Sequence, residues 1–263
     1  MVLQLERSIS QETIALKNAW KTVINLYMLK AFLDLLLPPV CPICSEDAQE
    51  GWFCKKCIDG IRMIKSPMCP SCGTPFISQE CEDHLCGICI KKKMPFSMAR
   101  SIGIYEGILM EAIHRFKYNG KTSMAKPLAG MMADALETRL DKSGFDLIVA
   151  VPLHRARLRE RGFNQSLLMA KELARICNMP VDHLNLKRTC ATEPQVNLKG
   201  KERLKNVRNA FSAVDKGVFK GKRILLIDDV YTTGATIMEC SRVLKRAGAE
   251  SIFVFTLARV VNL

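Results

Sequence analysis

Cysteines in the first third of the chain occur in pairs with a constant spacing. Nine of the twelve cysteines lie between residues 41 and 89. Two residues between two cysteines form a tight turn that brings both sulfurs onto one metal ion, and two such turns complete a tetrahedral zinc site. The sequence contains four such pairs and therefore predicts two zinc sites: Cys41/Cys44, Cys54/Cys57, Cys69/Cys72 and Cys86/Cys89.

The pairing of these turns stays open at the level of the sequence. Sequential pairing joins the first two pairs in one site and the last two in another, whereas interleaved pairing would alternate them. Cys81 and His84 lie between the last two pairs, so either could replace a cysteine in the second site. Because protein sulfur fills every position, we expect structural rather than catalytic zinc. An iron–sulfur cluster and unmetallated buried cysteines are the alternatives.

Two adjacent acids in the last sixth of the chain indicate a second kind of chemistry. Asp228 and Asp229 follow the apolar run 224–227 and precede a Thr-Thr-Gly turn. Hydroxyls and backbone N–H groups at a helix N-terminus bind phosphate, and Gly234 lets the backbone approach it closely. The carboxylates suit the neighbouring sugar hydroxyls. The pattern predicts a seat for a ribose 5-phosphate, although a plain strand end with a capped helix is the alternative.

Alternating strands and helices must position these acids. A nearly continuous apolar run over 145–151 is typical of a strand buried on both faces, and the run 223–227 has the same character. Strands alternating with helices predict a parallel, doubly wound α/β sheet, which binds ligands beyond the carboxyl ends of its strands. The further expected strands are 101–105 and 251–257, and the expected helices are 109–118, 124–140, 165–177 and 236–247.

The segment 224–236 resembles the phosphoribosyl-pyrophosphate motif of type I phosphoribosyltransferases. The resemblance implies that Asp228 and Asp229 bind the ribose hydroxyls and act in catalysis, and that residues 232–236 bind the 5-phosphate. It also implies Mg²⁺ bound with the phosphoribosyl pyrophosphate. The implied binding set is Asp228, Asp229, Val230, Tyr231, Thr232, Thr233, Gly234, Ala235 and Thr236.

A basic stretch follows the strand expected at 145–151. Four arginines alternate over 155–161, which predicts an extended loop whose guanidinium groups bind phosphate oxygens; a solvated basic face is the alternative. With the Arg-Gly-Phe-Asn-Gln sequence at 161–165 and the cysteine pairs after Pro38-Pro39, the chain is similar to the ComF family. That resemblance implies a pyrophosphate loop formed by Pro152, Leu153, His154, Arg155, Arg157 and Arg161.

The same family resemblance extends to the stretch 192–211. It implies a mobile loop that closes over the ligand and excludes water, with Gln195, Arg203 and Asn206 as its functional residues. An ordinary basic connection is the alternative.

These observations divide the chain into an N-terminal extension with an amphipathic helix (1–37), a double zinc ribbon (38–95) and a type I phosphoribosyltransferase-like domain (96–263). The helix is expected over 20–37, where charged residues and short length argue against a membrane span. No secretory signal is recognisable, and dense cysteines suit a reducing compartment, so we expect a cytoplasmic protein.

Composition constrains the partners. Hydrophobic residues make up 48% of the chain, enough for a substantial core, and the net charge of +13 favours anionic partners. The ComF resemblance implies phosphoribosyl pyrophosphate as ligand, a phosphoribosyltransferase with an unidentified acceptor, and a role in natural competence and DNA uptake. The alternative is a catalytically silent sensor or adaptor that binds single-stranded DNA, together with competence or recombination proteins.

Overall fold

The computed structural model describes five isolated positions, Trp20, Met28, Leu29, Phe32 and Leu35, and the segments 38–48, 52–77, 82–118, 120–139, 144–190 and 207–261. The chain divides into two compact units, Met1–Cys54 and Lys55–Leu263, and the second contains all the labelled elements. Most of the helix expected over 20–37 lies outside the described residues. No helix in the described segments combines the length and apolarity needed to cross a bilayer.

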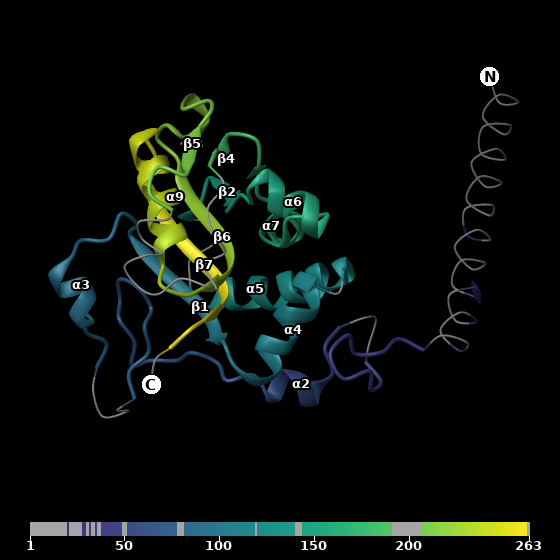
Figure 1. Ribbon diagram of the computed structural model, residues 1–263. Coiled ribbons are helices and arrows are strands. Elements are labelled where there is room, and N and C mark those ends of the chain that lie inside the picture. Colours follow the sequence, from purple (N-terminus) through teal and green to yellow (C-terminus); the bar gives the residue numbers. More distant parts are fainter. Residues whose placement is uncertain are drawn as a thin grey trace, which may run out of the picture. The chain divides into compact units, whose positions relative to one another are not determined.

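A five-stranded sheet with the order β1-β7-β6-β2-β3 forms the centre of the second unit (Figure 1). Every pairing between neighbouring strands is parallel. The expected parallel α/β sheet is therefore confirmed. The strands are β1 (Met98–Ile104), β2 (Leu147–Ala150), β3 (Val181–Asp182), β6 (Arg223–Tyr231) and β7 (Ser251–Arg259).

Helices cover both faces of this sheet. Helix α9 (Ala235–Arg246) lies on one face, while α5 (Ala125–Arg139) and α7 (Gln165–Cys177) pack together on the other (Figure 1). Helix α4 (Gly107–Tyr118) precedes α5 and is joined to it through a short 3-10 turn, η2 (Thr122–Met124). Burial of one stripe of each helix against the sheet is what stabilises these segments as helices.

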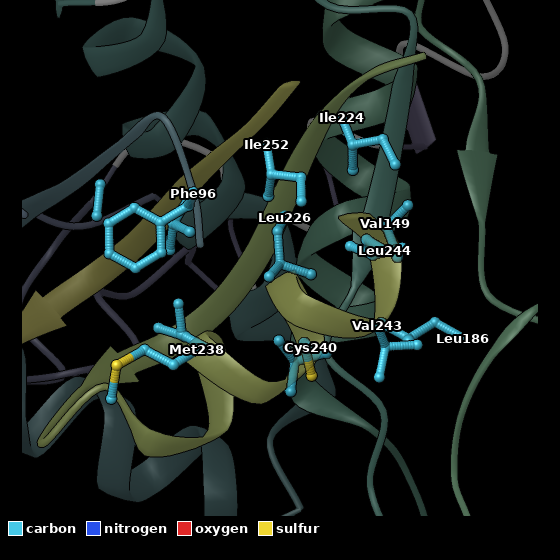
Figure 2. Close-up of a cluster of buried hydrophobic side chains, with 14 of the residues drawn as sticks. Phe96, Val149, Leu186, Ile224, Leu226, Met238, Cys240, Val243, Leu244 and Ile252 are labelled. Carbon is cyan, nitrogen blue, oxygen red and sulfur yellow. The ribbon is translucent and has the colours of Figure 1, made fainter. Parts of the chain in front are cut away.

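The core between α9 and the sheet follows from the strand pattern. Figure 2 shows Val149, Leu226 and Ile252 from three adjacent strands pointing towards Val243 and Leu244 of α9, and all five side chains are buried. Side chains of a strand alternate between faces, so an apolar run such as 224–227 supplies both faces at once. Each such side chain contributes about 1.5–3 kcal/mol of burial free energy.

A small second sheet was not predicted from the sequence. Strands β4 (Leu186–Arg188) and β5 (Phe211–Ala213) pair antiparallel, and they flank the segment in which the mobile loop was expected. Most of that segment lies outside the described residues, including Gln195, Arg203 and Asn206. The remaining short elements are α2 (Lys55–Asp59), α3 (Gly87–Lys91), α6 (Arg155–Arg161) and η5 (Gly217–Phe219).

Candidate functional site

The eight paired cysteines gather into two groups. Within each group the four sulfur atoms lie within 4.8 Å of one another. A tetrahedral zinc with Zn–S bonds of about 2.3 Å separates its sulfurs by about 3.8 Å, so four thiolates at this spacing fit the ion. The groups follow sequential pairing: Cys41, Cys44, Cys54 and Cys57 form the first, and Cys69, Cys72, Cys86 and Cys89 form the second.

Of the two residues proposed as substitute ligands, His84 is not a member of the second group. His84 stacks its ring on Phe76 with 3.9 Å between ring centroids. Cys81 lies outside the described residues. Among the described residues, four cysteines supply the second group without His84.

Backbone N–H groups prepare the second group for a cation. The N–H groups of Cys72 and Cys86 point at the Cys69 sulfur over 3.5 and 3.4 Å. Burial raises the pKa of Cys69, but these donors outweigh it and lower the pKa to about 7. A thiolate at neutral pH is the form that binds zinc.

The turn between Cys69 and Cys72 lies against the edge strand β1. The Ala99 N–H donates to the Ser71 carbonyl over 2.8 Å, and Arg100 donates to the Pro70 carbonyl over 3.0 Å. Gly73 has φ +73°, and a Cβ there would come within 2.5 Å of the Ala99 carbonyl oxygen. Only glycine fits both the left-handed backbone and this close approach, so the second cysteine group is attached directly to the sheet.

The two acids lie in a notch at the carboxyl edge of the sheet. The last paired residue of β2, Ala150, aligns with Ile227, whereas β6 continues to Tyr231 alongside β7. The sequence placed the end of this strand at Ile227, and that was wrong because β7 provides a partner as far as Arg259. Asp228 and Asp229 therefore lie beyond the last residue of β2. Because β2 is shorter than β6, there is space beside the two acids at the carboxyl edge of the sheet.

Three side chains from other elements converge on the acids. Lys117, at the end of α4, pairs with Asp229 at 2.8 Å, and both side chains are largely buried. Gln165 donates to the same Asp229 oxygen over 2.7 Å, and the Ser166 hydroxyl donates to Asp228 over 2.9 Å. The acids thus sit in a polar network built from α4, the start of α7 and β6.

The first turn of α7 is held by Asn164. Its side-chain oxygen accepts from the N–H groups of Ser166 and Leu167 over 3.0 and 3.3 Å, a helix N-cap. Its amide nitrogen donates to the carbonyl of Val151 over 3.1 Å. The cap therefore fixes Gln165 and Ser166 relative to the end of β2.

The pKa values of Asp228 and Lys117 both lie above their usual ranges. Burial and the neighbouring Asp229 carboxylate raise the pKa of Asp228 to about 7. Burial lowers the pKa of Lys117, but Asp229 and Asp228 outweigh it and hold that pKa above its usual range. Two acids side by side in a buried site repel each other, and the lysine offsets that repulsion.

The turn after the acids opens into a cavity. Gly234 adopts φ +73° as the N-cap of α9, and the Ala235 N–H lies 3.4 Å from the Thr233 hydroxyl. The cavity has a volume of about 160 Å³. It is lined by Lys117, Asp228, Asp229, Val230, Thr232, Gly234, Ala235, Thr236 and Ile237.

The arginine run is a helix, and the expected extended loop is wrong. His154 caps α6 by accepting from the Ala156 N–H, and Gly162 ends it with φ +80°. On a helix, residues four apart share a face, so alternate arginines divide into two rows rather than one. In one row, Arg161 donates to Gln165 over 2.6 Å and lies over the Tyr118 ring at 5.3 Å.

The sequence missed two side chains that contact the acids. The sequence signal for Lys117 is weak, a resemblance of the segment 116–118 to the ComF family, and Ser166 has no distinguishing signal. Pro152, Leu153 and Arg155 line a separate cavity of about 420 Å³ with residues of α7 and β4. Of the expected pyrophosphate-loop residues, Arg161 joins the acid network through Gln165.

Comparison with known proteins identifies the two parts of the chain. A family model described as a double zinc ribbon domain matches residues 32–90, and one described as a phosphoribosyl transferase domain matches residues 164–260. The first match and the cysteine geometry together support two zinc sites. The second assigns a phosphoribosyltransferase domain to the part of the chain that holds the diacid.

Three relatives match most of this chain. Competence protein F of Haemophilus influenzae is 37% identical over 75% of this chain and 87% of its own length. The DNA utilization protein YhgH of Escherichia coli is 32% identical over 86% of this chain and 100% of its own, and the competence protein ComFC of Bacillus subtilis is 30% identical over 78% and 83%. With this identity over this share of its length, the chain belongs to the ComF family of competence-associated proteins with a phosphoribosyltransferase domain.

Proposed function

We propose that this protein binds phosphoribosyl pyrophosphate in the cavity beside Asp228 and Asp229 and transfers its phosphoribosyl group to an acceptor still to be identified. The observation that supports this most directly is the cavity itself. Its lining includes both carboxylates and residues of the N-terminal turn of α9. A sugar needs hydroxyl acceptors and its phosphate needs N–H and hydroxyl donors, and the cavity offers both sets.

In this proposal the residues 232–236 bind the 5-phosphate and the two carboxylates accept hydrogen bonds from the ribose hydroxyls. The bond from the anomeric carbon to pyrophosphate breaks as a nucleophilic nitrogen of the acceptor forms a bond from the opposite face, and that nitrogen then loses a proton. The sugar gains positive charge in between, which Asp228 and Asp229 stabilise. Bound Mg²⁺ would neutralise the pyrophosphate that leaves.

Lys117 and Gln165 have a preparatory role in this scheme. Before the ligand binds, they hold the Asp229 carboxylate in a fixed orientation, through contacts of 2.8 and 2.7 Å. The carboxylate therefore needs little rearrangement when a ribose enters. Arg161, bound to Gln165, connects α6 to the same network and adds a positive charge to it.

Ligand binding tests the first half of the proposal. Binding to the native state alone must raise the unfolding temperature, so phosphoribosyl pyrophosphate with Mg²⁺ should raise it in the wild type. Asp229→Asn should abolish the shift. Asp146→Asn, which removes an acid paired with Arg223 at the far end of β6, should leave it intact. No shift in the wild type would contradict the proposal.

Turnover tests the second half. We expect pyrophosphate release from phosphoribosyl pyrophosphate when the right acceptor is present, measured across a panel of nucleobases, and loss of that release in Asp229→Asn. Ligand binding without release for any acceptor would instead favour a sensor.

The biological setting belongs to the proposal as well. The relatives are named for competence and DNA utilization, and we extend to this chain a cytoplasmic role in natural competence and DNA uptake. Competence or recombination proteins would be its partners.

A second candidate function, a single-stranded DNA adaptor, is favoured by a separate basic groove. This groove, of about 500 Å³, lies between the segment after α3 and the end of α9. It is lined by Lys93, Met94, Pro95, Phe96, Ser97, Arg242, Lys245 and Arg246. Four basic side chains in one groove suit a chain of phosphates, and such binding is independent of sequence and strongly weakened by salt.

Reversing charge in the groove distinguishes the two candidates. Lys245→Glu with Arg246→Glu should weaken binding of a fluorescent oligonucleotide and flatten its salt dependence, while the thermal shift with phosphoribosyl pyrophosphate persists. Asp229→Asn should abolish the thermal shift and leave oligonucleotide binding and its salt dependence unchanged. Oligonucleotide affinity that is unchanged by the double substitution would remove the groove from consideration.

A further inference from the structure

Arg259, the last residue of β7, is buried beside the second cysteine group. Its side chain donates to the Cys72 carbonyl over 2.8 Å and to the Thr74 hydroxyl over 2.7 Å. The same guanidinium lies 3.8 Å from the Cys72 sulfur. Arg259 is only 7% exposed, although charged residues are rarely buried without a partner of opposite charge.

A zinc–thiolate group would provide that partner. Within the described segments, no carboxylate lies close enough to form an ion pair with Arg259. Four thiolates around one Zn²⁺ carry a net charge of about −2. The guanidinium placed against Cys72 is therefore suited to a loaded site, and loss of the metal would disturb this charge balance.

The other face of Arg259 contacts the phosphate turn through Tyr231. The guanidinium lies 4.0 Å above the centre of the Tyr231 ring, a cation–π contact. Tyr231 in turn lies under Gly234: a Cβ on that glycine would collide with the tyrosine hydroxyl. The two strands are also joined here, because Tyr231 aligns with Arg259 and its carbonyl accepts from the Val260 N–H over 2.9 Å.

Packing makes this connection stiff. Cys69, Cys72 and Cys89 belong to the same buried cluster as Tyr231 and Ala235, the first residue of α9. Close-packed cores do not deform continuously, so a shift at the Cys72 turn must be taken up at its neighbours. The Gly234 turn is the neighbour that opens into the cavity.

We infer that Arg259 is a positioning residue that couples zinc in the second cysteine group to ligand binding at the Gly234 turn. This inference rests on the proposed binding of phosphoribosyl pyrophosphate in that cavity. Coupling between two sites is reciprocal: if zinc strengthens the binding of the ligand, the ligand strengthens the binding of zinc by the same factor. The ligand should therefore strengthen the binding of zinc by the second cysteine group, and a substitution of Arg259 should remove this effect.

The experiment follows zinc release from the full chain into a colorimetric chelator, with and without phosphoribosyl pyrophosphate and Mg²⁺. In the wild type, the ligand should slow release of one of the two zinc ions by at least about fivefold. Asp229→Asn corrects for any zinc taken up by the ligand itself, because that variant should not bind the ligand. Zinc content after purification is measured for every variant.

Arg259→Met should retain a folded chain with two zinc ions but lose the protection by ligand, and its affinity for phosphoribosyl pyrophosphate should fall by the same factor. Arg223→Met, a change of the same type at the opposite end of β6, should behave like the wild type. If Arg259→Met does not fold, Arg259→Lys is measured in its place: it keeps the charge but cannot make the paired hydrogen bonds to Cys72 and Thr74, so it should lose most of the protection.

The outcomes separate the two proposals. Wild-type protein that shows a thermal shift with the ligand but no change in zinc release overturns the coupling and leaves the proposed function intact. Absence of any thermal shift overturns both. Protection that persists in Arg259→Met shows that the coupling runs through other contacts and removes Arg259 from it.

Discussion

At the level of single residues, the most important feature is that side chains from other elements contact both acids and offset the repulsion between them. Lys117 and Gln165 both contact one oxygen of Asp229, and Ser166 contacts Asp228. These contacts decide how much negative charge faces the cavity at neutral pH. Both predictions at this scale therefore concern protonation.

Lys117→Met should weaken the binding of phosphoribosyl pyrophosphate by about tenfold or more at pH 7. Lys117 lowers the pKa of Asp228, so its loss lets that acid hold its proton more tightly and leaves less carboxylate to accept from the ribose. Titration calorimetry at pH 7 and pH 8.5 measures this, and affinity should partly recover at the higher pH. Lys121→Met, at an exposed position, is the control; equal loss at both pH values would contradict the explanation.

Asp228 should also impose a pH dependence on stability. Its pKa is about 7 in the folded chain, above the ordinary value of 3.8, so between these values the folded state binds more protons than the unfolded state. Its contribution is therefore greatest at low pH and is lost as the pH rises towards 7. Relative to Asp228→Asn, the wild type should lose on the order of 2 kcal/mol of unfolding free energy between pH 5.5 and pH 7.5, measured with urea.

A matched control exists for this measurement. The hydrogen bonds from Arg223 lower the pKa of Asp146 to about 2. Its effect on stability is complete above pH 4 and is lost only as the pH falls below that. Asp146→Asn should therefore differ from the wild type by the same amount at pH 5.5 and pH 7.5; a parallel trend in both variants would show that Asp228 is not the cause.

At the level of elements, unequal strand lengths create the site. Strand β6 outruns β2 by four residues, from Ile227 in register with Ala150 to Tyr231. The notch places the acids at the carboxyl edge, and the turn at Gly234, where α9 starts, lines the same cavity as the acids. The geometry of that turn depends on a residue without a Cβ.

Gly234→Ala should reduce affinity for phosphoribosyl pyrophosphate by about tenfold or more and lower stability by about 1–3 kcal/mol. The backbone there has φ +73°, and the added methyl would collide with the hydroxyl of Tyr231, so the turn must shift. Calorimetry and thermal unfolding measure the two effects. Gly144→Ala, where a Cβ meets nothing within 4 Å, should change neither; a wild-type affinity in Gly234→Ala would show that the phosphate is bound elsewhere.

At the level of the second unit, the second cysteine group is part of the protein core rather than an appendage. Three of its sulfurs share a buried cluster with the central strands and α9. Folding of the sheet and loading of this site are therefore parts of one process, because a structural zinc site contributes its binding free energy to folding.

Removal of zinc should accordingly destabilise the phosphoribosyltransferase part. We expect Cys72→Ser to lower the main unfolding temperature by about 5 °C or more, measured by calorimetry or by circular dichroism of the sheet and helices. Cys190→Ser changes an exposed cysteine outside both groups and is the control. An unchanged main transition in Cys72→Ser would show that the ribbon and the sheet fold independently.

The sequence by itself determined those features that depend on local spacing. Four cysteine pairs, apolar strand runs and the segment 224–236 each carry their signal within a few residues, so the metal groups, the parallel sheet and the position of the acids were predictable. A local pattern does not predict the structure when two conformations are compatible with it. The alternate arginines over 155–161 are compatible with an extended loop, but His154 and Gly162 cap this segment as a helix.

Tertiary structure alone decided which distant side chains meet. Lys117 reaches Asp229 from more than a hundred residues away, and Arg259 reaches Cys72 across a separation of 187 residues. The sequence does not distinguish these two residues from other lysines and arginines, most of which lie exposed on protein surfaces. The fold brings these charges into a buried, low-dielectric environment where they must be paired, and that requirement places Arg259 between the second cysteine group and Tyr231.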